Sequence, residues 1–147
     1  KEDINLQYGK GQILKEGSKD GNNAGGNVAI IAVGSMVEET YKAIDMLEKE
    51  NVHPAFVNPV FIKPMDTELI KRVAENHKHI IVVEEGIKKG GFGESVETFI
   101  LESGIGADVQ VMAIDDRFVE QGNVALLREE IGISYKNIYE KVMELTR

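Results

Sequence analysis

The feature that most constrains this chain is the alternation of short apolar runs with stretches in which apolar residues recur every three or four positions. The apolar runs have the length and content of buried strands, and they cover residues 28–33, 55–57, 80–83 and 109–114. The segments between them show the period of helices. A repeated strand–helix–strand order joins parallel strands by right-handed crossovers. The pattern therefore predicts a three-layer α/β fold.

Local signals indicate where the helices begin, end and face the sheet. Ser35 and Glu38 have the spacing of a capping box, Asp66 is placed to cap the second helix, and Gly104 is placed to end the third. A further helix is predicted over 123–131, and the last helix is expected to pack back on the sheet. The predicted apolar faces are Val37, Tyr41, Ile44 and Leu47 in the first helix; Leu69, Ile70, Val73 and Ala74 in the second; Phe92, Val96, Phe99 and Ile100 in the third; and Tyr135, Ile138, Tyr139, Val142 and Leu145 in the last.

The N-terminal part has a different character. Residues 11–16 can form an edge strand, and residues 17–27 are rich in Gly and Asn with almost no apolar content. Such a composition predicts a mobile connection that tolerates replacement by a two-residue turn. If the connection leads directly into 28–33, the two strands pair antiparallel. The whole chain, 1–147, is then predicted to be a single domain, with a mostly parallel sheet of about five strands and one antiparallel edge strand.

Composition excludes several classes of function. A net charge of −8 argues against a nucleic-acid partner, because phosphate binding needs a cationic surface. The absence of cysteine excludes disulfides, a thiolate nucleophile and cysteine-ligated metals. The longest apolar runs are far shorter than the roughly 20 residues that cross a bilayer, and no signal-peptide pattern follows Lys1. The chain also starts without Met, so we expect a piece of a longer protein.

The glycine cluster between the third strand and its helix is the strongest motif. Its position is where doubly wound folds bind phosphates, at a helix N-terminus. However, Val96 stands where the dinucleotide fingerprint needs its third glycine, and Phe92 and Gly93 replace the Lys-Ser/Thr pair of a phosphate loop. Lys88 and Lys89 would attract an anion, whereas Glu84 and Glu85 would repel one. A structural turn is therefore favoured over nucleotide binding.

Other candidate groups do not complete a catalytic constellation. Ser35 lacks the flanking glycines of a nucleophile elbow, and the three histidines show no metal-ligand spacing, which favours solvent-facing side chains. Carboxylates follow the third and fourth strands, at 84–85 and 115–116. Adjacent side chains on a strand point to opposite faces, so neither pair alone forms an acid–base dyad. Together they could hold a divalent cation, although capping of turns or pairing with Arg117 is the commoner use.

Four segments carry a resemblance to a known family. The run from Val83 to Gly93 resembles the signature of the C-terminal domain of transketolase-type, thiamine-diphosphate-dependent enzymes, and Phe61–Asp66 resembles the segment before the second helix of that domain. The run from Ile114 to Gly122, like Leu127–Ile133, is similar to the 1-deoxy-D-xylulose-5-phosphate synthase branch rather than to transketolases. The resemblance extends from about Tyr8 to the C-terminus.

The resemblance implies an enzyme of which this chain is one part. Enzymes of this branch condense pyruvate with glyceraldehyde 3-phosphate, lose CO₂, and supply precursors of isoprenoids, thiamine and pyridoxal. Their thiamine diphosphate and magnesium bind between the first two domains, and 19–23 here only superficially resembles the diphosphate motif. We therefore assign no catalytic, cofactor-binding or metal-binding residue to this chain. The resemblance further implies a cytoplasmic homodimer, with no membrane or nucleic-acid partner.

The expected role of the domain is to dock against the rest of the enzyme and to support the dimer. Four glycines within 86–93 indicate either positive φ or the close approach of another surface. The candidate docking residues are Glu85, Gly86, Gly90, Gly91, Gly93, Asp116, Phe118 and Gly122. The alternatives are the C-terminal part of a split transketolase or of an oxo-acid dehydrogenase beta subunit, or a freestanding regulatory module that binds an anion at 90–93.

Overall fold

A computed structural model describes residues 9–18, 25–60, 63–85, 91–114 and 134–146. The strands are β1 (Gln12–Lys15), β2 (Val28–Ala32), β3 (Ala55–Asn58), β4 (His79–Glu85) and β5 (Asp108–Ile114). The helices are α1 (Met36–Lys49), α2 (Thr67–Asn76), α3 (Phe92–Glu102) and α6 (Tyr135–Thr146). The helix predicted over 123–131 lies outside the described residues.

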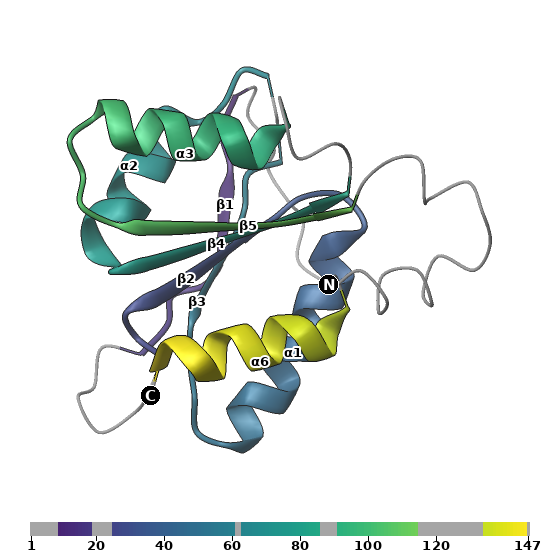
Figure 1. The fold of residues 1–147 in the computed structure, drawn as a ribbon. Coiled ribbons are helices and arrows are strands. Elements are labelled where there is room, and N and C mark those ends of the chain that lie inside the picture. The colour runs from purple at the N-terminus through teal and green to yellow at the C-terminus, as the bar shows by residue number, and fades with distance from the viewer. Residues whose placement is uncertain (1–8, 19–24, 61–62, 86–90, 115–133, 147) are drawn as a thin grey trace.

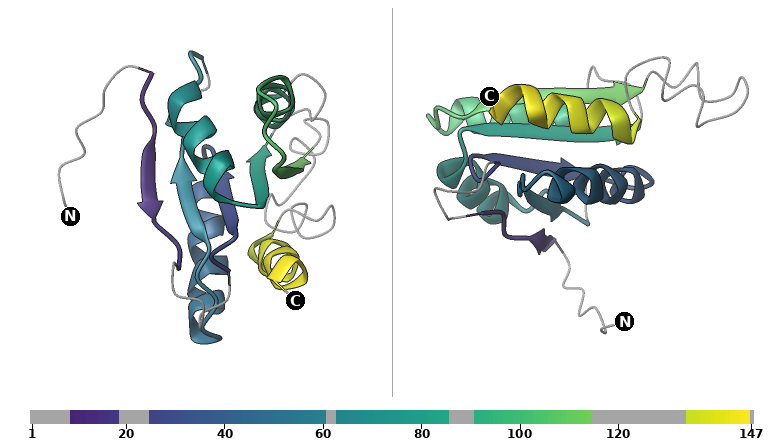
Figure 2. Two further views of the ribbon diagram at one scale, coloured as in Figure 1. Left: turned by 90° about the vertical axis from the view of Figure 1, so that its left-hand side faces the viewer. Right: turned by 90° about the horizontal axis from the view of Figure 1, so that it is seen from below.

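The strands form a five-stranded sheet in the order β1-β3-β2-β4-β5. The β3–β2, β2–β4 and β4–β5 pairs are parallel, and β1 pairs antiparallel with β3. Helices α2 and α3 cover one face of the sheet, and α1 and α6 cover the other (Figures 1 and 2). The predicted fold class is confirmed: three layers, a mostly parallel sheet and one antiparallel edge strand.

The partner expected for the edge strand is wrong. β1 pairs with β3, Gln12 opposite Asn58, and not with β2. Both sides of β2 are occupied by parallel neighbours, so the chain passes beyond β3 to reach a free edge. Ile13 and Leu14 then pack on opposite faces of the sheet. The alternation of these side chains predicts a strand, but it carries no information about the neighbouring strand.

The connection after β1 is described only at its two ends. The Ser18 backbone N–H donates to the His53 carbonyl at 2.8 Å. Gly25 is buried, and a Cβ atom built on it would lie 2.8 Å from the His53 nitrogen, at a φ of +93° that favours glycine. Both ends are therefore packed against the segment that leads into β3. Residues 19–24 lie outside the described part, so the predicted mobility of this connection stays a prediction.

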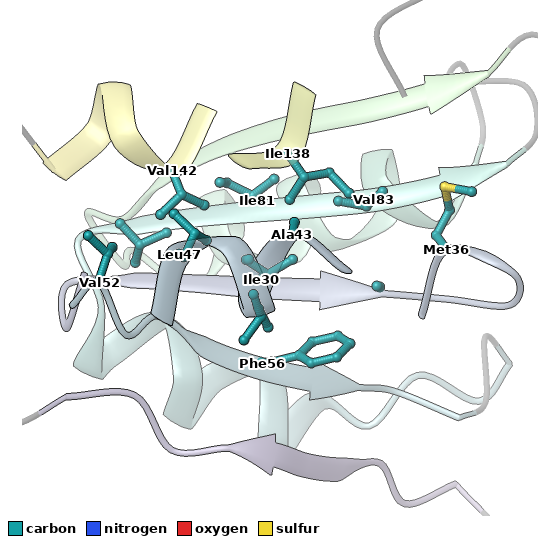
Figure 3. Close-up of a cluster of buried hydrophobic side chains, with 13 residues drawn as sticks. Ile30, Met36, Ala43, Leu47, Val52, Phe56, Ile81, Val83, Ile138 and Val142 are labelled. Carbon is teal, nitrogen blue, oxygen red and sulfur yellow. The ribbon is translucent and has the colours of Figure 1, made fainter. Parts of the chain in front are cut away.

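Two apolar clusters, one on each face, hold the layers together. On the α1/α6 face, Phe56 and Ile30 from the sheet meet Leu47 from α1 and Ile138 from α6 (Figure 3). All four side chains are at most 1% exposed. The other cluster joins the sheet to the apolar sides of α2 and α3. Burying a large aliphatic or aromatic side chain of this kind contributes about 1.5–3 kcal/mol. The last helix does pack back on the sheet, as predicted.

The predicted apolar faces are confirmed for α2, α3 and α6. Helix α1 is rotated about its axis relative to the prediction, so that a different set of its residues faces the sheet. Its buried residues include Met36, Thr40 and Ala43 beside the expected Ile44 and Leu47. Tyr41, which was expected in the core, is 38% exposed, and its ring meets Phe56 edge-on with centroids 5.0 Å apart. The rotation brings Glu39 to 8% exposure, where it meets the start of α6. The predicted ends are confirmed for α2, where Asp66 accepts from the Leu69 N–H, and for α3, which Gly104 follows at φ +72°.

Candidate docking site at the carboxyl edge of the sheet

The carboxyl ends of β2 and β4 mark the point where the chain direction of the sheet switches. After β2 the chain crosses one face through α1, and after β4 it crosses the other face through α3 (Figure 1). Open α/β sheets bind their ligands at such a switch point, because the two crossovers diverge there. The described residues at this edge are 33–36 after β2, Glu84 and Glu85 at the end of β4, and 91–95 at the start of α3.

Glu84 occupies the N-terminus of α3. Its side chain is 4% exposed and accepts the Gly93 backbone N–H at 2.8 Å. Burial raises the pKa of Glu84 above its ordinary value, and hydrogen bonds from the Gly93 and Phe92 amides partly oppose that shift. Amides at a helix N-terminus are the usual donors to a bound phosphate. Here the carboxylate of the protein itself takes their hydrogen bonds, which argues against a phosphate site at this turn.

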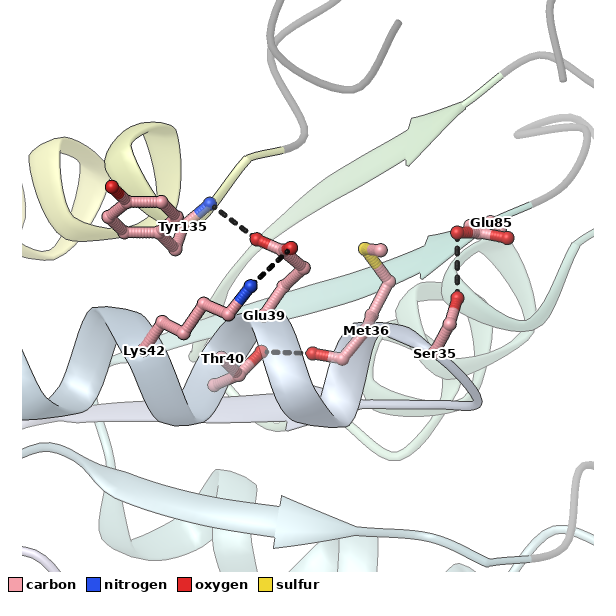
Figure 4. A network of polar contacts seen from close by, with 7 residues as sticks. All are labelled: Ser35, Met36, Glu39, Thr40, Lys42, Glu85 and Tyr135. Carbon is pink, nitrogen blue, oxygen red and sulfur yellow. Dashed lines mark hydrogen bonds and ion pairs between the residues drawn. The ribbon is translucent and has the colours of Figure 1, made fainter. Parts of the chain in front are cut away.

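Ser35 and Glu85 form a contact that bridges the switch point. The Ser35 hydroxyl donates to Glu85 Oε1 at 2.7 Å (Figure 4). The predicted capping box is therefore wrong: Ser35 lies before α1 with helical φ and ψ and makes no side-chain cap hydrogen bond. Glu85 contacts the α1 side of the edge, and Glu84 contacts the α3 side. The prediction that the two neighbouring carboxylates diverge is confirmed.

Gly93 and Gly91 differ in what their backbones do. Gly93 is buried inside α3, and a Cβ atom there would lie 2.5 Å from Val111 Cγ1 and 2.9 Å from Glu84 Oε1. Packing within the domain thus accounts for Gly93, and a docking partner is not needed to explain it. Gly91 precedes α3 in an extended conformation at φ −83°, half-buried, and its carbonyl accepts from Ser95. Neither glycine has a positive φ, so a left-handed backbone conformation is not the reason for glycine at either position.

The remaining candidate docking residues are not described. Gly86, Gly90, Asp116, Phe118 and Gly122 all lie outside the described residues, as do Asp115 and Arg117. The cation site considered between the carboxylates of 84–85 and 115–116 therefore stays untested. Glu85 and Gly91 are the candidate residues that the structure leaves at the outer rim of this edge.

The buried carboxylate of Glu39 is a second helix-capping acid that the sequence did not reveal. Glu39 Oε2 accepts the Tyr135 N–H at 3.1 Å, at the start of α6, and Glu39 Oε1 lies 3.4 Å from Lys42 Nζ (Figure 4). Its partner in α6 is 96 residues away, so no local spacing could indicate it. Asp66 acts similarly at α2, and its second oxygen accepts the Gly11 N–H of the edge-strand segment at 2.8 Å.

The histidines and the acids do not assemble a metal centre in the described part of the chain. No group of three or more His, Asp or Glu side chains there could hold a metal ion. The three histidines are partly exposed, and each has a partner: Asn51 for His53, the Val73 carbonyl for His77 and Asp108 for His79. A hydrogen bond from Gln110, followed by His79, holds the pKa of the Asp108 carboxyl below its usual value.

Among the helices of the described residues, none has the length and apolar content of a membrane span.

The sequence matches the profile of the transketolase C-terminal domain over residues 13–138. It is 37% identical over 143 residues to a 1-deoxy-D-xylulose-5-phosphate synthase of Dehalococcoides mccartyi and 38% identical over 141 residues to one of Brevibacillus brevis. These alignments cover 96% and 95% of this chain and 21% of each relative. The chain therefore spans about a fifth of the length of these relatives.

Two solved structures share the fold. A split-gene transketolase, described as an inactive beta4 tetramer, matches with a TM-score of 0.80 and 28% identity over 98% of this chain and 45% of that chain. A 2-oxoglutarate:ferredoxin oxidoreductase from Magnetococcus marinus matches with a TM-score of 0.62 and 18% identity over 95% of this chain and 20% of that chain, which is a likeness of fold alone. By its sequence profile and its fold, this chain belongs to the transketolase C-terminal domain family.

Proposed function

We propose that this chain is the C-terminal domain of a 1-deoxy-D-xylulose-5-phosphate synthase. The parent enzyme condenses pyruvate with glyceraldehyde 3-phosphate and releases CO₂, and its product feeds isoprenoid, thiamine and pyridoxal synthesis. The observation that carries the proposal is the alignment of nearly the whole chain with synthases of several bacteria at 31–38% identity. We further propose that the parent works in the cytoplasm as a homodimer.

The described residues do not fit thiamine diphosphate or its magnesium ion. They contain no group of three metal-ligating side chains, and the amides at the start of α3 donate to Glu84. A diphosphate placed at that helix would meet a carboxylate instead of free N–H donors. In the proposal the cofactor is therefore held by the other domains of the parent, and this domain takes no part in the chemical steps.

The part assigned to this domain is docking. Glu85 and Gly91 lie at the outer rim of the switch point, and both flank residues 86–90. We propose that this rim contacts the preceding domains or the second subunit, together with Gly86, Gly90, Asp116, Phe118 and Gly122. Gly93 does not belong to that contact, because it is buried against Val111.

The experiment compares the isolated chain with the full reading frame that contains it. Calorimetric titration with thiamine diphosphate and magnesium should show no binding to the isolated chain, although it unfolds cooperatively. The full-length protein should release CO₂ from pyruvate and form deoxyxylulose phosphate when glyceraldehyde 3-phosphate is added. Micromolar cofactor binding by the isolated chain, or a full-length protein inactive on pyruvate, would contradict the proposal.

A split transketolase is the second candidate, favoured by the TM-score of 0.80 to such a protein. An oxo-acid dehydrogenase beta subunit is a further form of the same alternative. The substrate separates the cases, since a transketolase transfers a two-carbon ketol group from a ketose phosphate and does not release CO₂. Assays with both donors on the assembled protein decide between synthase and transketolase. An oxo-acid dehydrogenase would also release CO₂ from its oxo acid, but it would form no deoxyxylulose phosphate when glyceraldehyde 3-phosphate is added. The freestanding anion-binding module is disfavoured, because Glu84 fills the place that its anion would take.

A further inference from the structure

Helix α3 carries an apolar surface that the domain itself leaves open. Leu101 is 77% exposed, the largest exposure among the large hydrophobic side chains of the described residues. On the same helix, a groove of about 380 Å³ lies between α3 and the segment before α2 and is lined by Met65, Phe99, Ser95, Thr98, Glu94 and Glu102. Met65 and Phe99, its two apolar side chains, are half-buried. A single exposed leucine needs no explanation, but a leucine on the helix that lines a groove with two partly open apolar side chains is typical of a contact surface.

The charged side chains that α3 contributes to this surface are all negative. Glu94, Glu97 and Glu102 are exposed on α3, and the helix carries no Lys or Arg. None of the three pairs with a basic side chain of the described residues. Glu102 also lies in the last helical turn, where the helix dipole disfavours an acid. We define Met65, Phe99, Thr98 and Leu101 with the three glutamates as the acidic-rimmed α3 surface.

We propose that the acidic-rimmed α3 surface binds a segment from the rest of the parent chain, one that presents an apolar side chain flanked by Lys or Arg. Charge complementarity selects such a partner, and a second copy of the same face would set glutamates against glutamates. About four-fifths of the length of the relatives lies outside the aligned region. The surface also continues from the Gly91 rim, since α3 begins at the next residue. The inference rests on the proposed docking role.

The first test compares amide hydrogen exchange of residues 92–102 in the isolated chain and in the full-length protein. Docking suppresses local opening of the helix, so exchange should be about tenfold slower in the full-length protein. Raising the ionic strength should remove part of this difference, because salt screens the glutamates. Equal rates in the two proteins would overturn the proposal. This comparison does not depend on which reaction the parent catalyses.

Variants then locate the contact. In the full-length protein, Leu101→Ser and Glu97→Lys should restore fast exchange in 92–102, whereas Glu75→Lys, an equal charge change on the exposed side of α2, should not. In the isolated chain Leu101→Ser should leave the rates unchanged. If Glu75→Lys reduces protection from exchange as much as Glu97→Lys does, only the net charge of the chain matters. If the isolated chain self-associates and Leu101→Ser abolishes the association, the occupant of the surface is a second copy of the chain. Either result would refute the inference.

Discussion

At the scale of single residues, carboxylates tie this domain together by accepting N–H groups at helix starts. Glu84 accepts a backbone N–H at the start of α3, Glu39 accepts one at the start of α6, and Asp66 accepts one at the start of α2. Each of these residues is less than 10% exposed, and each belongs to a different part of the chain. A buried carboxylate is stable only when hydrogen bonds replace its hydration, and helix N-termini offer several unpaired donors together.

The first prediction concerns the pH dependence that Glu84 causes. Its pKa is higher in the folded chain than the ordinary 4.5, so folding favours the protonated form. Its contribution to the free energy of unfolding is therefore complete below about pH 4.5 and falls as the pH rises through the folded pKa. Glu84→Gln keeps an acceptor for Gly93 and removes this loss. In urea denaturation, the free energy of unfolding of the variant should therefore increase relative to that of the original chain as the pH rises.

The control for this measurement is Glu97→Gln, on the exposed side of α3. It removes one negative charge at an exposed position, so it shows what the loss of a charge alone does at each pH. A Glu84→Gln difference that follows this control between pH 4 and 7 would mean that burial of Glu84 is not the cause.

The second prediction concerns Gly93→Ala. Alanine is a better helix former by about 1 kcal/mol, but its methyl group would lie 2.5 Å from Val111 Cγ1. Overpacking of this kind costs about 1–3 kcal/mol, so we expect net destabilisation in thermal melts of the isolated chain. Gly106→Ala is the matched control, since nothing lies within 4 Å of a Cβ there, and it should change little. Adding Val111→Ala should recover part of the loss; without such coupling the close approach is not the cause.

At the scale of elements, local signals were predictable from the sequence and distant partners were not. The cap at Asp66 and the end at Gly104 were found because their partners lie within a few residues. Ser35 was misassigned because its hydroxyl partner, Glu85, is 50 residues away. The apolar periods of α2, α3 and α6 were clear, whereas α1 is rotated so that Glu39 reaches α6. The docking role proposed for Glu85 and Gly91 rests on the resemblance and on the four glycines within 86–93.

The third prediction concerns the link between the edge strand and α2. Asp66 accepts from Leu69 at the helix start and from Gly11 just before β1. Asp66→Ala removes both hydrogen bonds, one of them a helix cap, and should cost about 2–3 kcal/mol. Asp66→Asn keeps one acceptor oxygen and should cost less. Denaturation measures the total, and amide exchange at Gly11 shows whether β1 is released; a protected Gly11 in the alanine variant would contradict the link.

The fourth prediction revises the expectation for residues 17–27. A two-residue turn connects only neighbouring strands, about 4.8 Å apart, but β3 lies between β1 and β2. Replacing 17–27 with Asn-Gly should therefore detach β1 and lower the denaturation midpoint. Removing three residues within 19–24 keeps the packed ends at Ser18 and Gly25, and it should change stability by less than about 1 kcal/mol. If both changes lower the denaturation midpoint equally, the pairing of β1 contributes little to the stability of the domain.

At the scale of the whole molecule, the domain has the topology of a ligand-binding fold, and described residues of the domain itself contact one another across its switch point. The strand order places β2 and β4 side by side, and the two crossovers leave this edge on opposite faces. Glu84 then occupies the helix start, and Ser35 and Glu85 join the two sides. The fold class followed from the strand–helix alternation. The contacts of Glu84, Ser35 and Glu85 at this edge did not follow from it, because they depend on which strands become neighbours.

The position of β1 also determines the order in which the native structure can assemble. Pairing Gln12 with Asn58 closes a loop that contains β2, α1 and β3. The β2–β3 and β4–β5 pairs need only one crossover each, whereas the β2–β4 pair is separated by α1, β3 and α2. Closing a longer loop before any contact is formed slows the search, and topologies rich in distant contacts fold slowly. We therefore expect the β2–α1–β3 and β4–α3–β5 units to form first, and the β2–β4 and β1–β3 pairs, which close longer loops, to find their register later.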